Sequence, residues 1–279
     1  MKPEWLKTKL DTGNKFPKIA SVLRELGLTT ICQEAHCPNK STCWGSGTAT
    51  FMILGEVCTR NCMFCTVENG KPDKLDPTEP FRLAEAVERL SLKYVVITSV
   101  DRDDLVDRGA GHFASCVEEV RKIRARVEVL IPDYLGKDLE TVVASGPDVI
   151  GHNIEVVSRL TPEVRDWRAS YEKSLQVLQE VKRLDGRIKT KSSLMLGIGE
   201  TDEEVIRTMH DLRNAGVDML TLGQYLRPSK NQIQVSSYVT PAEFSEFGKM
   251  AEEIGFICSS GPFVRSSFAA AEMYEKSVA

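Results

Sequence analysis

Short runs of apolar and β-branched residues alternate with amphipathic segments from residue 51 onward. Each run has the length of a buried strand, and each amphipathic segment repeats its apolar positions at helical spacing. The predicted strands are Phe51 to Val57, Tyr94 to Val100, Val127 to Ile131, Asp148 to His152, Ile188 to Leu196 and Met219 to Gly223. The predicted helices are Phe81 to Leu92, Phe113 to Ala125, Lys137 to Ala144, Tyr171 to Leu184, Glu203 to Ala215 and Ala242 to Ile254.

Six strand–helix units in succession predict parallel strands, because each helix returns the chain to the same end of the sheet. We therefore expect an α/β fold, a partial (β/α)6 TIM-type barrel at 51–255, with extensions at 1–50 and 256–279. A doubly wound open sheet has the same periodicity. It is disfavoured because no G-x-G-x-x-G turn follows the first strand.

The composition is that of an ordinary globular protein, with 42% hydrophobic and 27% charged residues among 279. The formal net charge of -4 gives no field that would collect phosphates, so no nucleic-acid partner is expected. The first residues carry no apolar stretch after their charges. This predicts neither a secretory signal nor a membrane span, and hence a cytoplasmic protein, although an organellar chain whose targeting segment has been removed would look the same.

The chain has eight cysteines, and six of them fall between Cys32 and Cys65. A long chain without an export signal is expected to keep them reduced, as ligands rather than as disulfides. The other two, Cys116 and Cys258, stand in apolar patterns and are predicted to be core thiols.

Cys58, Cys62 and Cys65 form a C-x3-C-x2-C loop directly after the first predicted strand. Four-iron clusters normally take four thiolates, so three from one loop leave one iron open for another ligand. A zinc site is the alternative, but zinc would need a fourth ligand, and the next histidine is the distant His112.

A second triplet, Cys32, Cys37 and Cys43, lies upstream with C-x4-C-x5-C spacing. It can hold a second cluster, again with an incomplete cysteine set, and zinc is again the alternative. His36 lies inside this triplet, and we expect it at the surface or behind the ligands rather than on the metal.

The first loop, with aromatic Phe64 before its last cysteine, resembles the radical S-adenosylmethionine (radical SAM) superfamily. The two triplets in this order resemble the lipoyl synthase family, and the resemblance covers nearly the whole chain. It is also carried by the segments EAHCPN, TCW, GEVCTRNCMFCTV, TSVDRDDLVDRGAGHF and GQYLRPS.

This resemblance implies a sulfurtransferase that inserts two sulfur atoms, at C6 and C8, into a protein-bound octanoyl group. It implies two [4Fe-4S] clusters and S-adenosyl-L-methionine as cofactors, the auxiliary cluster supplying the sulfur. The implied partners are an octanoylated lipoyl carrier protein or lipoyl domain, a one-electron donor such as flavodoxin or ferredoxin, and an iron-sulfur cluster carrier.

The resemblance also assigns the clusters to residues. Cys58, Cys62 and Cys65 would hold the cofactor cluster, with the open iron chelated by S-adenosylmethionine. The other triplet and Ser267 would hold the auxiliary cluster, with Ser266 as the second candidate for the oxygen ligand. Phe268 stands where the family's R-S-S-Y element has tyrosine, so this sequence lacks that hydroxyl.

The remaining implied contacts are with S-adenosylmethionine. Thr98 and Ser99, at the end of the second strand, would bind its amine. Asn153 and Glu155, after the fourth strand, would accept hydrogen bonds from its ribose. The other implied cofactor-binding residues are Phe64 and Lys191, and the segment Gly197 to Glu200 would back the adenine.

Two other functions remain open at this point. A methylthiotransferase acting on transfer RNA would also carry two clusters, but it would need a basic RNA-binding appendage. A non-catalytic zinc module would bind zinc and be colourless.

Overall fold

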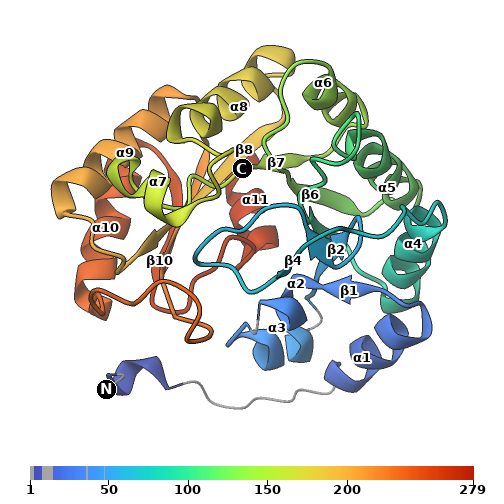
Figure 1. Cartoon of the computed structure of the whole chain (residues 1–279), viewed down its shortest axis with the longest axis horizontal. Coiled ribbons are helices and arrows are strands. Elements are labelled where there is room, and N and C mark those ends of the chain that lie inside the picture. Colours follow the sequence, from blue (N-terminus) through green and yellow to red (C-terminus); the bar gives the residue numbers. More distant parts are fainter. Residues whose placement is uncertain (1–2, 8–14, 36, 47) are drawn as a thin grey trace. The chain divides into compact units, whose positions relative to one another are not determined.

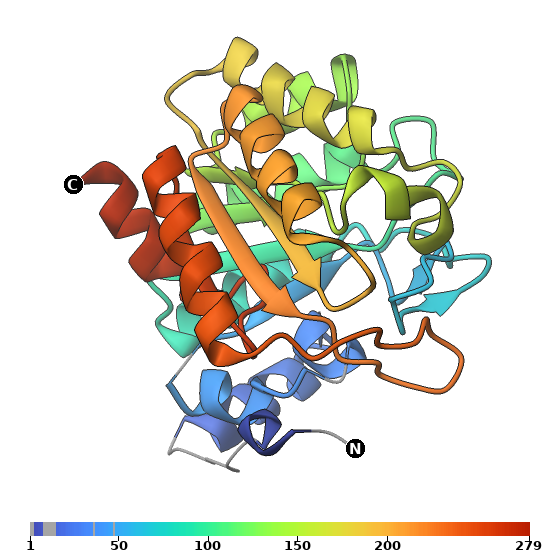
Figure 2. The same ribbon diagram turned by 90° about the vertical axis from the view of Figure 1, so that its left-hand side faces the viewer.

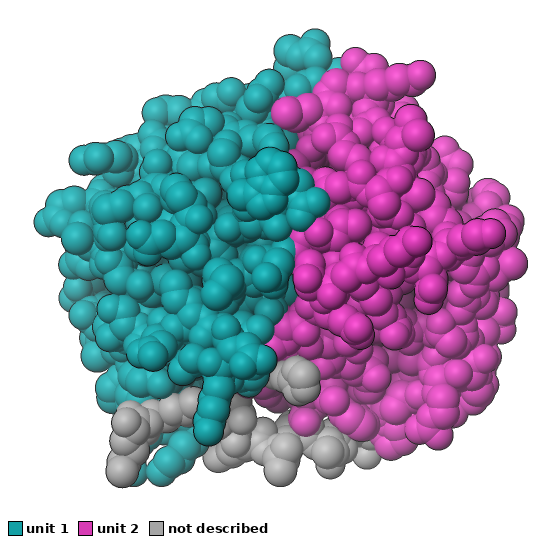
Figure 3. Space-filling model, viewed as in Figure 1, with its two compact units in different colours: residues 1–7, 61–65, 149–279 teal, residues 8–60, 66–148 magenta. Residues whose placement is uncertain are grey.

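The computed structural model describes residues 3–7, 15–35, 37–46 and 48–279. The prediction for His36 therefore lies outside the described residues. The chain divides into two compact units (Figure 3). Unit 1 comprises residues 1–7, 61–65 and 149–279, and unit 2 comprises residues 8–60 and 66–148.

Unit 2 contains four strands of one sheet, in the order β1-β2-β5-β6. Strand β1 is antiparallel to β2, whereas β2, β5 and β6 are parallel. The strands are β1 (Thr29–Thr30), β2 (Thr50–Ile53), β5 (Tyr94–Ser99) and β6 (Arg126–Leu130), and β3 (Val57–Cys58) pairs separately with β4 (Glu68–Asn69). The helices are α1 (Phe16–Glu25), α2 (Ile31–Glu34), α3 (Lys40–Ser46), α4 (Glu79–Leu90), α5 (Ala110–Lys122) and α6 (Lys137–Ala144).

Unit 1 contains the strands β7, β8, β9 and β10, which are all parallel (Figures 1 and 2). They are β7 (Val149–Gly151), β8 (Lys189–Leu196), β9 (Met219–Gln224) and β10 (Ile257–Gly261). The helices are α7 (Thr161–Val164), α8 (Tyr171–Leu184), α9 (Asp202–Asn214), α10 (Pro241–Ile254) and α11 (Ala270–Val278), with short 3-10 turns η1 (Glu4–Leu6) and η2 (Ser158–Leu160).

The core of unit 1 follows from the alternation of side chains along its strands. Leu194 and Leu196 of β8 pack in one apolar cluster with Leu220 and Leu222 of β9 and with apolar residues of α8, α9 and α10. Because successive side chains of a strand point to opposite faces, Lys191, Ser193 and Thr221 lie on the other face of these strands.

All six predicted strands are present, with ends that differ by a few residues. The first strand was predicted to run to Val57 but ends at Ile53, because Leu54 and Gly55 take positive φ angles of 71° and 95° and turn the chain. Strand β10 was missed. Its sequence ICSSG is short and half polar, and pairing with β9 places it in the sheet.

Helix starts in unit 1 agree with the capping residues in the sequence. Thr201 and Thr240 each accept a hydrogen bond from the third residue of the following helix, and Glu204 and Glu243 return one. Within the described ranges, no helix has both the length and the apolar character needed to cross a membrane.

Candidate active site and cluster-binding residues

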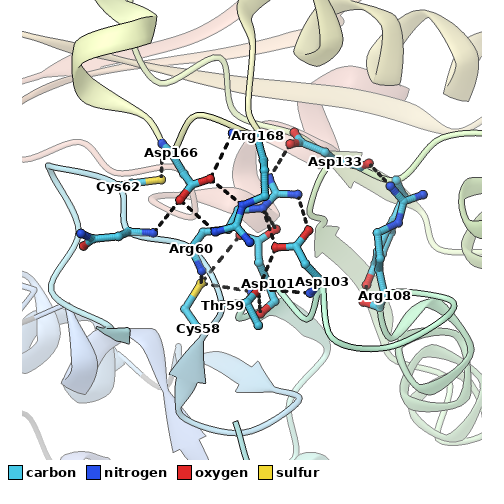
Figure 4. Close-up of polar contacts among 12 residues, drawn as sticks. Cys58, Thr59, Arg60, Cys62, Asp101, Asp103, Arg108, Asp133, Asp166 and Arg168 are labelled. Carbon is cyan, nitrogen blue, oxygen red and sulfur yellow. Dashed lines mark hydrogen bonds and ion pairs between the residues drawn. The ribbon is translucent and has the colours of Figure 1, made fainter. Parts of the chain in front are cut away.

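Cys58 ends the short strand β3, just after the turn at Leu54 and Gly55. Its Sγ accepts hydrogen bonds from the backbone N–H groups of Arg60 and Asp101, each at 3.4 Å (Figure 4). The thiol also lies 3.9 Å from Oδ2 of Asp101. Two N–H donors favour negative charge on a sulfur atom, which is compatible with the metal-binding role predicted for Cys58.

Cys62 and Cys65 belong to unit 1. The Sγ of Cys62 accepts a hydrogen bond of 3.4 Å from the backbone N–H of Asp166 (Figure 4). The carboxylate of Asp166 accepts from the backbone N–H of Asn61 at 3.0 Å and from the guanidinium of Arg168 at 2.8 Å. These hydrogen bonds, that from Arg168 foremost, hold the pKa of Asp166 well below its usual range.

The end of the cysteine loop is fixed by backbone contacts within unit 1. The N–H of Met63 donates to the carbonyl of Val164 at 2.8 Å, and the carbonyl of Met63 accepts from Ile233 at 2.9 Å. Phe64 packs against the apolar cluster of this unit. Its aromatic ring therefore anchors the loop between two cysteines, and its predicted contact with the cofactor stays a prediction.

Arg60 lies between the cysteines of the loop and is 7% exposed. Its guanidinium donates to both carboxylate oxygens of Asp103 at 3.0 Å and to Asp133 at 2.5 Å, and lies 3.3 Å from Asp101. Burial opposes the charge of Arg60, but Asp103, Asp101 and Asp133 outweigh it and raise its pKa. Arg60 was not among the predicted site residues, because its acidic partners are more than 40 residues away in the sequence.

The turn at Leu54 is held from both sides within unit 2. Its N–H donates to Oε2 of Glu79 at 2.9 Å, and its carbonyl accepts from Arg102 at 3.0 Å. His112 Nε2 lies 2.7 Å from the same Glu79 oxygen. Through its hydrogen bond to Leu54, Arg102 thus holds the backbone that leads into the cysteine loop.

Glu79, His112 and Cys116 place one ligand atom each within 4.8 Å of one another. In a tetrahedral zinc site, two ligand atoms that each lie about 2.1 Å from the zinc would be roughly 3.4 Å from each other. The 2.7 Å between Glu79 and His112 is instead a hydrogen-bond distance. Burial, with a smaller effect from Glu79, raises the pKa of Cys116, which is fully buried. The prediction that Cys116 is a core thiol is confirmed.

Thr98 and Ser99 end β5, as predicted. The hydroxyl of Thr98 donates to the carbonyl of Leu130 at 3.3 Å. The hydroxyl of Ser99 is buried and has no hydrogen-bond partner among the described residues. Buried polar atoms are rarely left unpaired, so this hydroxyl fits a polar ligand at the carboxyl end of the strand.

Asn153 and Glu155 follow β7, and the amide of Asn153 donates to Glu155 Oε1 at 3.0 Å. The backbone of Glu155 has a φ of 67° and bonds to β8 through its N–H, which donates to Ser193 at 3.0 Å. Burial raises the pKa of Glu155. His152 is buried, with Nε2 3.0 Å from the hydroxyl of Ser174.

Lys191 lies in β8 and is buried, and its carbonyl accepts from the N–H of His152 at 3.0 Å. In the following turn, the N–H groups of Gly197, Ile198 and Gly199 all donate to the carboxylate of Glu200, at 2.5, 2.9 and 3.0 Å. These backbone donors are therefore engaged within the turn that was expected to back an adenine.

The upstream triplet lies entirely in unit 2. Cys32 is in α2 and Cys43 in α3, and the N–H of Cys37 donates to the carbonyl of Cys32 at 3.2 Å. Burial raises the pKa of Cys32 and raises that of Cys43 to about 11. Charge on other thiols of the triplet adds to both shifts. Three thiols are soft donors of the kind that suits iron.

None of the eight cysteines, all of which are among the described residues, forms a disulfide. Cys258 packs against the apolar cluster of unit 1, and burial raises its pKa to about 12. It is a core thiol, as predicted.

Ser267 is half-buried and lies in a turn of the C-terminal segment. The N–H of Phe268 donates to the carbonyl of Arg265 at 2.9 Å. This segment passes against β9, since a Cβ placed on Gly223 would lie 2.2 Å from the carbonyl oxygen of Val264. Gly223 thus permits the close passage of the backbone that carries Ser267.

We expect Gly223→Ala to displace this segment and to lower the free energy of unfolding by about 1–3 kcal/mol, as overpacking does. Urea unfolding measures the change. Gly186→Ala is the matched control, because its Cβ would lie 3.7 Å from the nearest atom. Equal stabilities of the two variants would contradict the account of Gly223.

Two family models match the chain. One is described as the radical SAM superfamily and matches residues 52–212, and the other is the N-terminal domain of lipoyl synthase and matches residues 1–37. Among curated relatives, lipoyl synthase of Myxococcus xanthus is 52% identical over 99% of this chain and 94% of its own length. Lipoyl synthase of Methanocella arvoryzae is 51% identical over 100% and 96%.

Solved structures support the fold alone, since their identities are low. Methylornithine synthase aligns with a TM-score of 0.59 at 12% identity, covering 88% of this chain and 75% of that one. SuiB of Streptococcus suis, bound to S-adenosylmethionine, aligns with a TM-score of 0.56 at 11% identity, covering 77% and 50%. With the radical SAM family match, these likenesses confirm the predicted partial barrel.

The two cysteine triplets indicated this family. Family models that match residues 1–37 and 52–212 support it, and so do relatives that match nearly the whole chain. This chain belongs to the lipoyl synthase family of the radical SAM superfamily.

Proposed function

We propose that this chain converts a protein-bound octanoyl group into a lipoyl group by inserting sulfur at C6 and C8, with its two cysteine triplets holding separate [4Fe-4S] clusters. The proposal is carried by the spacing of the two cysteine triplets, neither of which contains a disulfide, and by the backbone N–H groups that donate to Cys58 and Cys62. Family membership gives the enzyme class, a radical SAM sulfurtransferase that uses S-adenosylmethionine. When bound, the clusters supply the electron for reductive cleavage of S-adenosylmethionine and the sulfur for insertion.

In this proposal, Cys58, Cys62 and Cys65 bind the cofactor cluster as thiolates. Backbone N–H groups donate to Cys58 and Cys62, which stabilises the charge on those two sulfurs. The carboxylate of Asp101 lies near Cys58, and two negative charges there would repel each other. Arg60, 3.3 Å from Asp101, offsets that repulsion.

The hydroxyls of Thr98 and Ser99 would orient the amine of S-adenosylmethionine, since the buried hydroxyl of Ser99 has no hydrogen-bond partner in the described part of the chain. Asn153 and Glu155, already aligned by their hydrogen bond, would accept from the ribose hydroxyls. Phe64 and Lys191 remain predicted cofactor contacts. Orientation of the cofactor matters because the reacting atoms must be brought within about 3–3.5 Å of each other.

The triplet of Cys32, Cys37 and Cys43, in the N-terminal extension at 1–50, would bind the auxiliary cluster. Ser267, in the C-terminal extension at 256–279, would be its fourth ligand, and the barrel at 51–255 would hold the other cluster. An alkoxide is a hard ligand among soft thiolates. It is therefore the ligand expected to leave first when the cluster gives up its sulfur.

The substrate would arrive on an octanoylated lipoyl carrier protein or lipoyl domain. Because each cofactor cleavage consumes an electron, the enzyme would also use a one-electron donor such as flavodoxin or ferredoxin. A cluster that gives up sulfur must be rebuilt, which assigns a role to an iron-sulfur cluster carrier. We place these steps in the cytoplasm.

Anaerobic purification followed by iron and sulfide analysis tests the proposal. Two four-iron clusters predict about eight irons per chain. Lipoyl formation is then followed on an octanoylated peptide with S-adenosylmethionine and a reductant. Bound zinc without iron, or full iron without lipoyl product, would contradict the proposed function.

We expect Ser267→Ala to lower lipoyl formation by at least tenfold, because the auxiliary cluster would lose its oxygen ligand. Product is measured by mass spectrometry of the octanoylated peptide. Ser266→Ala is the matched control and should keep near-normal activity. If only the control loses activity, the ligand is Ser266; if neither does, the oxygen ligand lies elsewhere.

A further inference from the structure

Leu54 directly follows strand β2 and has a positive φ of 71°. Leucine rarely adopts this left-handed conformation, because its Cβ then lies too close to the following carbonyl oxygen. A residue other than glycine stays there only where its surroundings hold it, and residues held in this way are concentrated at functional sites. Three residues separate Leu54 from Cys58, the first cysteine of the C-x3-C-x2-C loop. The contacts that hold Leu54 therefore bear on the path of the chain to that cysteine.

Leu54 is held through both its backbone and its side chain by residues of unit 2. Its N–H donates to Oε2 of Glu79 at 2.9 Å, and its carbonyl accepts from Nη1 of Arg102 at 3.0 Å. The residue is 1% exposed, and it lies so close to Gly109 that a Cβ placed there would come within 2.8 Å of Cδ1 of Leu54. Because both backbone partners are side chains remote in the sequence, the conformation of Leu54 depends on them.

Glu79 is the first residue of α4, and its side chain is 13% exposed. The same oxygen that accepts from Leu54 lies 2.7 Å from Nε2 of His112, in α5. Since a carboxylate oxygen only accepts, the imidazole is the donor of this second hydrogen bond. Moving the oxygen away would leave two buried donors unpaired, which is costly. His112 therefore keeps the Glu79 carboxylate directed at Leu54.

The φ angle of Leu54 sets the direction in which the chain leaves β2 toward Cys58. A return of φ to the ordinary range of about -60° to -120° would redirect every residue that follows. At present the carbonyl of Cys58 accepts from the N–H of Gly70 at 3.0 Å, and its Sγ accepts from the N–H groups of Arg60 and Asp101 (Figure 4). A redirected chain would displace the sulfur from these donors.

We propose that Glu79 is a positioning residue of the cofactor cluster: its carboxylate holds Leu54 at a positive φ and so places the thiolate of Cys58 for iron binding. The inference rests on the proposed assignment of Cys58, Cys62 and Cys65 to that cluster. Glu79 acts through Leu54 and is not itself a ligand. An acidic residue at the start of α4 would also stabilise the helix through its charge, so the hydrogen bond must be tested apart from the charge.

Glu79→Gln and Glu79→Asp separate these two effects. Glutamine keeps the length of the side chain and an acceptor oxygen, whereas aspartate keeps the charge but is shorter by one methylene and withdraws its oxygen from Leu54. We expect anaerobically purified Glu79→Gln to keep about eight irons per chain and Glu79→Asp to keep about six or fewer. Electron paramagnetic resonance of the reduced protein should show the cofactor-cluster signal, identified by its change on adding S-adenosylmethionine, at least twofold weaker in Glu79→Asp.

Hydrogen exchange follows the hydrogen bond itself. Exchange of the Leu54 amide, measured by mass spectrometry of overlapping peptides, should be at least tenfold faster in Glu79→Asp than in the wild type or in Glu79→Gln. Glu85→Asp is the matched control, because Glu85 lies in the same helix and its side chain is 53% exposed. This control should change neither the iron content nor the exchange of Leu54.

Full iron in Glu79→Asp, or equal losses in Glu79→Asp and Glu79→Gln, would overturn the inference about Glu79. Unchanged exchange of the Leu54 amide in Glu79→Asp would overturn it as well. So would loss of both clusters together, since that loss would report general unfolding. By contrast, a Cys58→Ala variant that kept about eight irons would refute the assignment of the cofactor cluster, on which the inference rests.

Discussion

Replacing Cys62 with alanine should abolish lipoyl formation and reduce the iron content from about eight to about four per chain. The reason is that Cys62 belongs to the loop assigned to the cofactor cluster, and its sulfur already receives the N–H of Asp166 at 3.4 Å. Iron analysis and single-turnover assays with an octanoylated peptide measure both effects.

The matched control for this loss is Cys258→Ala, which removes a thiol that packs against the apolar core of unit 1. That variant should keep about eight irons and should lose only stability, about 1 kcal/mol or somewhat more as small core truncations do. Loss of the same four irons from both variants would show that iron content reports folding, and would remove Cys62 from the ligand set.

Replacing Arg60 with methionine should lower the free energy of unfolding by about 3–5 kcal/mol, the cost of breaking a buried ion pair by removing one partner. Asp133, whose side chain is 1% exposed, would then be left without the cation at 2.5 Å. Asp101 and Asp103 would lose the same partner. Urea unfolding at neutral pH measures the change.

Arg159→Met is the control, because Arg159 pairs with Glu204 at the surface at 2.7 Å. Exposed pairs contribute about 0–1 kcal/mol, so this variant should differ little from the wild type. Arg60→Lys should recover part of the lost stability, since it restores the charge but not the forked geometry of the guanidinium. Equal effects at the two arginines would contradict a buried role for Arg60.

The main strands and helices could be predicted from the sequence, because in long periodic segments the spacing of the apolar residues shows which side chains are buried. It failed at β10, where Ile257 to Gly261 have little apolar character and join the sheet only through pairing with β9. It also placed the end of the first strand too late. The positive φ at Leu54 depends on Glu79 and Arg102, which are remote in sequence, so no local pattern reveals it.

The cysteines were predicted as ligands from their spacing, because metal ligands near one another in sequence leave a recognisable pattern. Arg60 was missed because its partners Asp103 and Asp133 become neighbours only on folding. Electrostatic and hydrogen-bond partners of the predicted ligands thus required the structure.

The carboxylate of Glu200 accepts hydrogen bonds from three successive backbone N–H groups in the turn after β8. The turn consequently has its shape before any small molecule arrives, and binding beside it involves little loss of main-chain entropy. A ligand approaching that turn meets a surface whose strongest donors are already satisfied by an internal anion. Recognition there is left to shape and to carbonyl groups, which favours a flat, uncharged ring over a phosphate.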